Sequence, residues 1–214
     1  MKNILFDLDG TIINSEEGIT NCIRYVLDFW GMEQPPQEEL LCFIGPPLKE
    51  SFQKKYGFDE EKAIQSVVKY RERFDREGIF ECELYAGVAE LIQELHGKGY
   101  HLAVASSKPE TACQRIIEHF HLETYFDGVY GATLDGSIST KKQVLEHVFK
   151  ENGMKREDTI LIGDTKFDAI GAKEAEIPCI GVTYGFGTAE ELKEAGAVLV
   201  CDSTKEVADY IETL

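Results

Sequence analysis

Short apolar runs alternate along the chain with segments in which apolar residues recur every three or four positions. The first pattern predicts buried strands at 3–8, 101–105, 128–131, 159–162, 177–182 and 197–200. The second predicts helices around 88–95, from Pro109, around 144–149, over 166–176 and at the C-terminal end. Strands that alternate with helices form βαβ units. We therefore expect an α/β fold, with a Rossmann-like parallel sheet and helices on both faces.

The segment 15–81 interrupts this alternation directly after the first strand. Helical spacing predicts a helix over 16–30, with Ser15 as its N-cap, and another over 59–76. The turn Gly45-Pro46-Pro47 breaks the chain between them. An all-helical block at this place indicates an inserted cap domain. The predicted domains are a core of residues 1–14 and 82–214 and a small helical cap of residues 15–81.

Composition and charge narrow the class of protein. The chain has 214 residues, of which 43% are hydrophobic, as in ordinary globular proteins. With 39 acidic and 22 basic residues its net charge is −17, which disfavours nucleic acid and anionic membranes as partners. The first apolar run is too short for a secretory signal. We expect a cytoplasmic monomer whose six cysteines, none in a Cys-x-x-Cys pair, are buried reduced thiols.

Polar residues follow the predicted strands at four places. They are Asp7-Leu8-Asp9-Gly10-Thr11, Ser106-Ser107-Lys108, Lys141-Lys142 before the helix at 144, and the stretch from Gly163 to Asp168. In parallel sheets, ligands bind outside the carboxyl ends of the strands. These segments therefore predict one site that combines carboxylates, hydroxyls and an ammonium group.

The spacing of the acidic residues predicts a metal site. Asp7 and Asp9 lie two apart on an extended chain and so point to one side. Asp164 and Asp168 lie four apart at a helix start and so share a face. Carboxylates this close raise one another's pKa unless a cation lies among them. All of these ligands are oxygen, which favours Mg²⁺.

Each motif taken alone also has a structural explanation. Asp9-Gly10 is a common turn, Ser106 could cap the following helix, and a lone lysine is usually a surface residue. The pair Gly185-x-Gly187 hints at a dinucleotide-binding loop, but the third glycine and an acidic partner are missing. The functional interpretation rests on all four segments falling at element ends together.

Together these motifs resemble the four signature motifs of the haloacid dehalogenase-like hydrolases. The insert resembles the small cap of the phosphoglycolate phosphatase and β-phosphoglucomutase branch. Four further segments are similar to bacterial 5′-nucleotidase-like and phosphoglycolate phosphatase-like members: Phe43-Ile44-Gly45-Pro46-Pro47-Leu48, Tyr70-Arg71-Glu72-Arg73-Phe74, Ser107-Lys108-Pro109 and Leu134-Asp135-Gly136.

The resemblance implies a role for each motif residue. Asp7 is the expected nucleophile, and Asp9 the expected general acid and base. Mg²⁺ is expected on the side chains of Asp7 and Asp164 and the main-chain carbonyl of Asp9, with help from Asp168. The expected phosphate contacts are Gly10, Ser106, Ser107 and Lys141. The family spacing favours Lys141 over Lys142, because Val144 and Leu145 follow at the usual distance.

The substrate stays open among small phosphorylated metabolites, such as nucleoside 5′-monophosphates and phosphoglycolate. Gly45, Lys49 and Arg71 are the candidate substrate contacts in the cap. Three other functions are alternatives to the hydrolysis of a phosphate ester. A mutase usually has an arginine after the cap glycine, where this chain has Pro46-Pro47. A phosphonatase needs a buried cap lysine. A non-catalytic phosphoacceptor of the receiver type would be near half this length and have no cap.

Overall fold

The computed structural model describes residues 2–214 and divides the chain into two compact units. The core unit comprises the residues up to Asn14 together with Leu84–Leu214, and the cap unit is Ser15–Glu83. The sequence places the second boundary after residue 81, slightly earlier. The segments that join the two units pair as a two-stranded sheet of β2 (Ile13–Asn14) and β3 (Glu83–Leu84).

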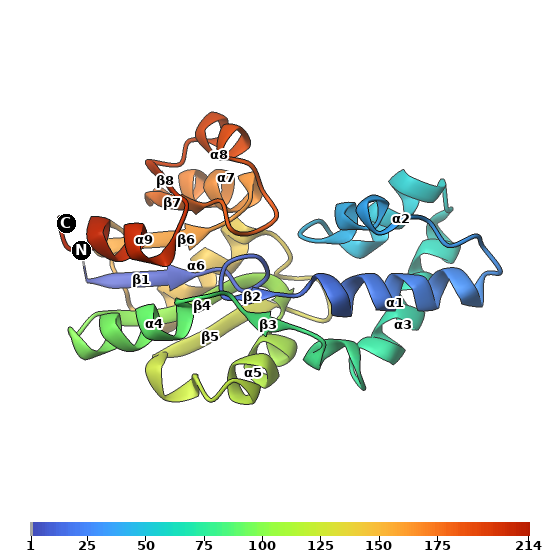
Figure 1. Cartoon of the computed structure of the whole chain (residues 1–214), viewed down its shortest axis with the longest axis horizontal. Helices are drawn as coiled ribbons and strands as arrows, with labels where there is room; N and C mark the ends of the chain where they lie inside the picture. Colours follow the sequence, from blue (N-terminus) through green and yellow to red (C-terminus); the bar gives the residue numbers. More distant parts are fainter. Residues whose placement is uncertain (1) are drawn as a thin grey trace. The chain divides into compact units, whose positions relative to one another are not determined.

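A six-stranded parallel sheet forms the centre of the core unit (Figure 1). Its order is β5-β4-β1-β6-β7-β8, with every neighbouring pair parallel. The strands are β1 (Asn3–Phe6), β4 (His101–Pro109), β5 (Gly128–Ala132), β6 (Thr159–Gly163), β7 (Cys179–Val182) and β8 (Leu199–Cys201). The predicted parallel α/β sheet is confirmed. Because β1 and β6 are central neighbours, the residues that follow them meet at one edge.

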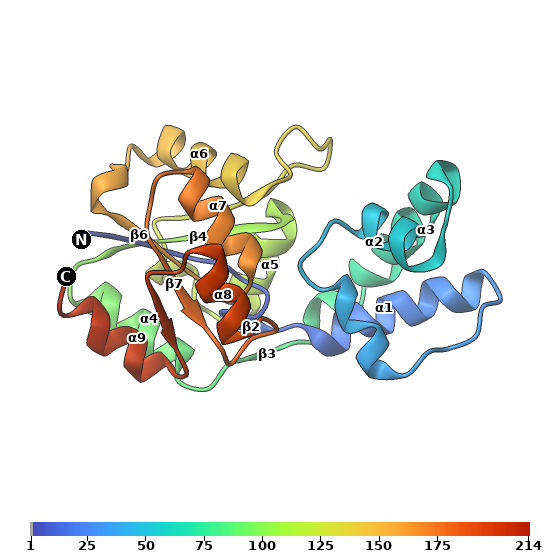
Figure 2. The same cartoon turned by 90° about the horizontal axis from the view of Figure 1, so that it is seen from above.

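Helices cover both faces of this sheet. They are α4 (Val88–Gly97), α5 (Glu110–His119), α6 (Lys141–Asn152), α7 (Lys166–Glu174), α8 (Ala189–Ala195) and α9 (Thr204–Ile211). Helices α6 and α7 pack over buried side chains of the sheet such as Leu5, Ala103 and Leu161. Helices α4 and α9 contact each other on the opposite face (Figure 2). Right-handed βαβ crossovers require this division of the helices.

Several element bounds differ from the sequence prediction. Strand β1 ends at Phe6 rather than at residue 8, because residues 8–13 fold into a tight turn in which the N–H groups of Ile12 and Ile13 donate to the Leu8 carbonyl. Strand β4 runs past residue 105 to Pro109, with an irregular register against β5. Helix α8 was not predicted from the sequence. Its N-cap is Thr188, whose hydroxyl accepts the N–H of Glu191.

The cap unit contains α1 (Glu16–Phe29), α2 (Leu48–Tyr56) and α3 (Glu60–Phe74). Sequence reasoning predicted α1 and α3 but not α2. Ser15 stands at the N-cap of α1, yet its buried hydroxyl has no hydrogen-bond partner, and the N–H of Gly18 donates to the Glu81 carbonyl instead. The cap core is aromatic, with Phe52 stacked on Phe58 at 5.9 Å between ring centroids.

The thiols differ from the expectation at two positions. No cysteine among residues 2–214 forms a disulfide. Cys22, Cys113, Cys179 and Cys201 are buried as expected, whereas Cys82 is half-buried and Cys42 is exposed. Among residues 2–214, every helix is too short or too polar to cross a lipid bilayer.

Candidate active site

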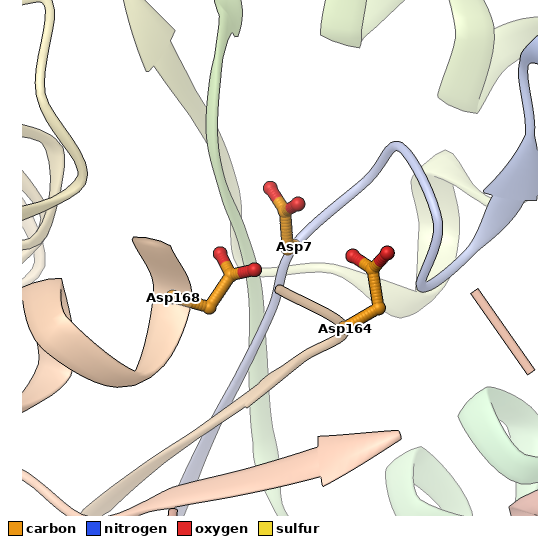
Figure 3. A group of neighbouring side chains, drawn as sticks. All are labelled: Asp7, Asp164 and Asp168. Atoms are coloured by element: carbon orange, nitrogen blue, oxygen red, sulfur yellow. The ribbon is translucent and has the colours of Figure 1, made fainter. Parts of the chain in front are cut away.

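Three aspartates gather at the carboxyl ends of β1 and β6. Asp7 follows β1, Asp164 follows β6, and Asp168 lies in the first turn of α7 (Figure 3). Each offers a carboxylate oxygen, and these atoms lie within 4.8 Å of one another. All three residues are buried. The described residues thus include a compact, buried, all-oxygen cluster.

Lys141 joins two of these carboxylates. Its ammonium nitrogen Nζ lies 2.6 Å from Asp7 Oδ1 and 2.9 Å from Asp168 Oδ1, and it donates to the Ala105 carbonyl at 2.7 Å. Lys141 is buried, whereas Lys142 is exposed. The structure therefore brings Lys141 into the cluster and leaves Lys142 at the surface.

A capping box at the start of α6 determines which lysine faces inward. The hydroxyl of Thr140 accepts the N–H of Gln143, and the Gln143 side chain accepts the N–H of Thr140. This reciprocal bond fixes the first turn. Lys141 is then the first helical residue and lies on the same buried side as Val144 and Leu145.

Asp168 is held from its own helix start. The N–H and hydroxyl of Thr165 donate to Asp168 Oδ2 at 3.0 and 2.8 Å. Because Oδ2 is bound there, Oδ1 is the oxygen that faces Lys141. The carboxylate therefore has a fixed orientation.

Asp164 is completely buried and accepts two hydrogen bonds. The hydroxyl of Thr11 donates to Oδ1 at 3.3 Å, and the N–H of Phe186 donates to Oδ2 at 2.8 Å. Neither donor carries a full charge, so the negative charge of Asp164 stays uncompensated by these contacts.

The cluster is electrostatically unfavourable by itself. Burial raises the pKa of Asp7 to about 6, against the opposing charge of Lys141. Burial, followed by the charges of Asp168 and Asp7, raises the pKa of Asp164 well above its usual value. Burial would lower the pKa of Lys141, but the charges of Asp168 and Asp7 outweigh it and raise that pKa. Three carboxylates and one ammonium leave an excess of negative charge, which a divalent cation on oxygen ligands would neutralise.

The carboxylate of Asp9 does not join this cluster. Both of its oxygens pair with Lys108, at 2.7 and 3.0 Å from Nζ. Asp9 lies in the turn that follows β1 rather than on the extended strand that the sequence predicted. Burial is the main cause of the raised pKa of Asp7 and the nearby charge of Asp9 adds to it, so the convergence of these two side chains stays a prediction. The proposed contact of the Asp9 main-chain carbonyl with Mg²⁺ stays a prediction.

The predicted phosphate contacts lie on two neighbouring segments. Ser106 is buried and Ser107 half-buried, and both belong to β4 rather than to the start of α5. The hydroxyl of Ser106 accepts the N–H of Lys108 at 3.3 Å. Gly10 has φ of +85° and lies against Asp164, so a Cβ there would be 2.0 Å from Asp164 Oδ2. Only glycine fits this turn.

Sequence reasoning missed Lys108 as a site residue. The sequence analysis named it only as part of the segment after the predicted strand 101–105, and its position at a strand end was the available signal. Its side chain is 7% exposed and its partner Asp9 15% exposed, so the pair is largely shielded from water.

The candidate substrate contacts Gly45, Lys49 and Arg71 all belong to the cap unit. Gly45 is exposed with φ of +99°, and Arg71 is exposed on α3. Lys49 forms an ion pair with Glu60 at 2.8 Å. These are surface positions within the cap, and none contributes to the cap core.

Comparison with known proteins identifies the family. A model described as haloacid dehalogenase-like hydrolase matches residues 4–182. The chain belongs to the haloacid dehalogenase-like hydrolases. The family resemblance and the enzyme class expected from the motifs are therefore confirmed.

Relatives of this hydrolase cover almost the whole chain. A 5′-nucleotidase of Pseudomonas aeruginosa is 38% identical over 99% of this chain and 96% of its own length. A solved structure described as a predicted phosphatase from Clostridium acetobutylicum is 44% identical, with a TM-score of 0.95, and covers 100% of this chain and 99% of its own. The tyrosine-protein kinase PtkA of Mycobacterium tuberculosis is 32% identical over 92% of this chain and 67% of its own.

Proposed function

We propose that this hydrolase cleaves small phosphomonoesters with Mg²⁺, through an aspartyl-phosphate formed on Asp7. The observation that carries the proposal is the position of the Asp7 carboxylate. It lies between an ammonium group at 2.6 Å and two further buried carboxylates. The relatives named 5′-nucleotidase and phosphatase support a phosphate ester as substrate.

The donor set fits Mg²⁺. The side chains of Asp7 and Asp164, with the main-chain carbonyl of Asp9, would hold the ion, and Asp168 would help directly or through water. When bound, Mg²⁺ neutralises charge on the phosphoryl oxygens, so that an anionic nucleophile can approach them. This local charge offsets the net charge of −17, which would otherwise repel an anionic substrate.

In the first step Asp7 attacks phosphorus. Lys141 fixes Oδ1, so we assign Oδ2 as the attacking oxygen. A bond forms between Oδ2 and phosphorus while the bond from phosphorus to the ester oxygen breaks. Asp9, in its protonated form, donates a proton to the departing oxygen, which leaves as an alcohol.

In the second step water releases the phosphate. Asp9 accepts a proton from water as the water oxygen attacks phosphorus. The bond between phosphorus and Asp7 then breaks, which yields inorganic phosphate and restores the Asp7 carboxylate. Asp9 regains the proton it lost, so the cycle is balanced.

The phosphoryl oxygens need donors during both steps. We assign the hydroxyls of Ser106 and Ser107 to this task, and Lys141 contributes its positive charge, because its three N–H groups already have partners. Gly10 stays a proposed contact through close approach of its backbone, since its N–H donates to the Ile13 carbonyl at 2.8 Å. Lys141 is well suited because its position depends on three contacts at 2.6 to 2.9 Å rather than on the substrate. The site is then preorganised for charge on the phosphoryl group.

The leaving group is the part of the substrate that the cap would select. Gly45, Lys49 and Arg71 remain the proposed contacts, and the phosphorylated metabolite stays open between nucleoside 5′-monophosphates and phosphoglycolate. The ion pair of Lys49 with Glu60 is exposed to water, which screens it, so a substrate could displace Glu60 at little cost.

Phosphonatase chemistry is less well supported. It needs a desolvated lysine in the cap to form a Schiff base. Every cap lysine is exposed or half-exposed: Lys49, Lys54, Lys55, Lys62 and Lys69. Lys62 lies over the Phe58 ring at 4.1 Å and Lys69 pairs with Glu72, so both already have structural partners.

Release of inorganic phosphate from a panel of esters tests the proposal. The panel includes nucleoside 5′-monophosphates, phosphoglycolate and a sugar phosphate, each with Mg²⁺ and with excess chelator. We expect release that requires Mg²⁺, and the best ester identifies the substrate class. Release that persists in chelator would contradict the metal role. Transfer of labelled phosphate from ATP to tyrosine, without ester hydrolysis, would favour the kinase-type activity named for PtkA.

A further inference from the structure

The loop after β7 contacts Asp164 although it carries no signature motif. This loop, Tyr184-Gly185-Phe186-Gly187, supplies the N–H that donates to Asp164 Oδ2 at 2.8 Å. Gly185 and Gly187 are the pair that hints at a dinucleotide-binding loop in the sequence. The structure gives them a different environment, directly against an aspartate of the acidic cluster.

Neither glycine leaves room for a side chain. A Cβ on Gly185 would lie 2.2 Å from the Gly10 carbonyl oxygen and 2.5 Å from Asp164 Oδ2. A Cβ on Gly187 would lie 2.1 Å from the Asp164 carbonyl oxygen. Two of these contacts are with main-chain atoms, so rotation of a side chain cannot relieve them.

Glycine is needed at these two positions because the loop backbone lies close to Asp164 and Gly10, and not because the backbone is left-handed there. Neither Gly185 nor Gly187 has a positive φ. Gly10, in the turn after β1, combines a φ of +85° with a similar close approach to Asp164 Oδ2. Main-chain atoms of two loops therefore lie directly against Asp164. This arrangement restricts three positions to glycine, which indicates that the position of the carboxylate matters.

Hydrogen bonds join the two loops around the carboxylate. The hydroxyl of Tyr184 donates to the Thr11 carbonyl at 3.3 Å, and the Thr11 hydroxyl donates to Asp164 Oδ1 at the same distance. The Phe186 N–H completes the arrangement at Oδ2. Each oxygen therefore receives one uncharged donor, which orients the carboxylate without neutralising it.

We propose that the loop Tyr184–Gly187 is a positioning element for a metal ligand. It holds Asp164 in the orientation that binds the cation, and Gly185 and Gly187 must be glycine so that its backbone can reach the carboxylate. The inference rests on the proposed function, because it assumes that Asp164 binds Mg²⁺. Groups that orient ligating carboxylates typically change metal affinity by about 10- to 100-fold when they are altered.

Calorimetric titration with Mg²⁺ alone tests the inference without relying on turnover. We expect Gly185→Ala and Gly187→Ala to weaken Mg²⁺ binding by about 10-fold or more. Gly97→Ala is the matched control, because that glycine lies in α4 with nothing within 4 Å of the added Cβ. We expect the control to keep the wild-type dissociation constant.

A milder variant covers the case in which the alanine variants do not fold. Tyr184→Phe removes only the hydroxyl that anchors the loop to Thr11, and we expect weaker Mg²⁺ binding by a smaller factor. Folded glycine variants with the wild-type dissociation constant would overturn the inference. If they fail to fold, an unchanged constant for Tyr184→Phe overturns it.

The wild-type titration separates this inference from the proposed function. A wild-type protein that binds no Mg²⁺ would refute the proposed metal site, and with it the assumption behind the inference. A wild-type protein that binds Mg²⁺ as tightly as its folded glycine variants would refute the positioning role alone, since ester hydrolysis with Mg²⁺ would still stand.

Discussion

Lys108 holds both carboxylate oxygens of Asp9, with its Nζ at 2.7 Å from Oδ1 and 3.0 Å from Oδ2. The two side chains are largely shielded from water. A two-point contact of this kind fixes the direction of the carboxylate. If Asp9 is the proton donor to the leaving group, its direction determines which oxygen it reaches.

Lys108→Ala should therefore lower kcat more than it changes KM. We expect a loss of about tenfold or more, up to the ~10²–10⁴ that general acid–base catalysis contributes as a whole. The loss should be larger for an alkyl phosphate than for p-nitrophenyl phosphate, whose leaving group needs no proton. Steady-state kinetics on both esters measure this difference. An equal loss on both would argue against a role through Asp9, and Lys108→Arg should recover part of the activity.

Lys141 and Lys142 make a second pair of matched variants. Without Mg²⁺, Lys141→Ala leaves buried carboxylates without their ammonium partner, a change that typically destabilises by about 3–5 kcal/mol. Thermal unfolding in chelator should show a clearly lower Tm for this variant, and Mg²⁺ should restore part of it. The exposed Lys142→Ala should unfold at the wild-type temperature. Equal Tm values for the two variants would contradict the assignment of Lys141.

The free energy of unfolding should depend on pH because of the acidic cluster. Burial first, with nearby carboxylates, raises the pKa of Asp7 to about 6, above its ordinary value of 3.8. Between these values the folded, metal-free protein holds more protons than the unfolded chain, so its stability falls as pH rises through this window. Protons and Mg²⁺ compete for the same oxygens.

Saturating Mg²⁺ should therefore raise Tm more at about pH 7.5 than at about pH 5. At 100 times the dissociation constant, a bound ion stabilises by about 2.7 kcal/mol. Unfolding followed with Mg²⁺ and with chelator at both pH values measures the difference. A Mg²⁺ effect that is the same at both would mean that the ion does not bind at these carboxylates.

Much of the fold can be predicted from the local pattern of apolar and polar residues. Alternation of apolar runs with helical periodicity predicts the parallel sheet, because buried strands and amphipathic helices differ in period. The exact strand ends do not follow, since the tight turn after Phe6 and the irregular register after Ala105 depend on pairing between distant strands. Helix α2 was not predicted, because it is short and mostly polar.

The contacts of the site also differ in whether they could be predicted from the sequence. Residue type and position at strand ends were enough to select Asp7, Asp164 and Asp168 as neighbours, whereas Lys141 was preferred to Lys142 only through the spacing of the family that the motifs resemble. The partnership of Lys108 with Asp9 was not visible, because it joins residues 99 positions apart through the direction of a turn. The contact of the loop after β7 with Asp164 was equally hidden, since glycine pairs occur in many loops for other reasons.

Asp7 should become phosphorylated during turnover, and detection of this phosphoryl group tests the proposed mechanism most directly. Wild-type protein is mixed with its best ester and Mg²⁺ and quenched in acid within the first turnover. The protein is then digested, and the masses of its peptides are measured by mass spectrometry. We expect the peptide that contains Asp7 to carry the mass of one phosphoryl group. Asp7→Asn should fold normally, bind Mg²⁺ more weakly, release no phosphate and carry no added mass. Turnover by Asp7→Asn, or a phosphoryl group on another residue in the wild type, would contradict the claim.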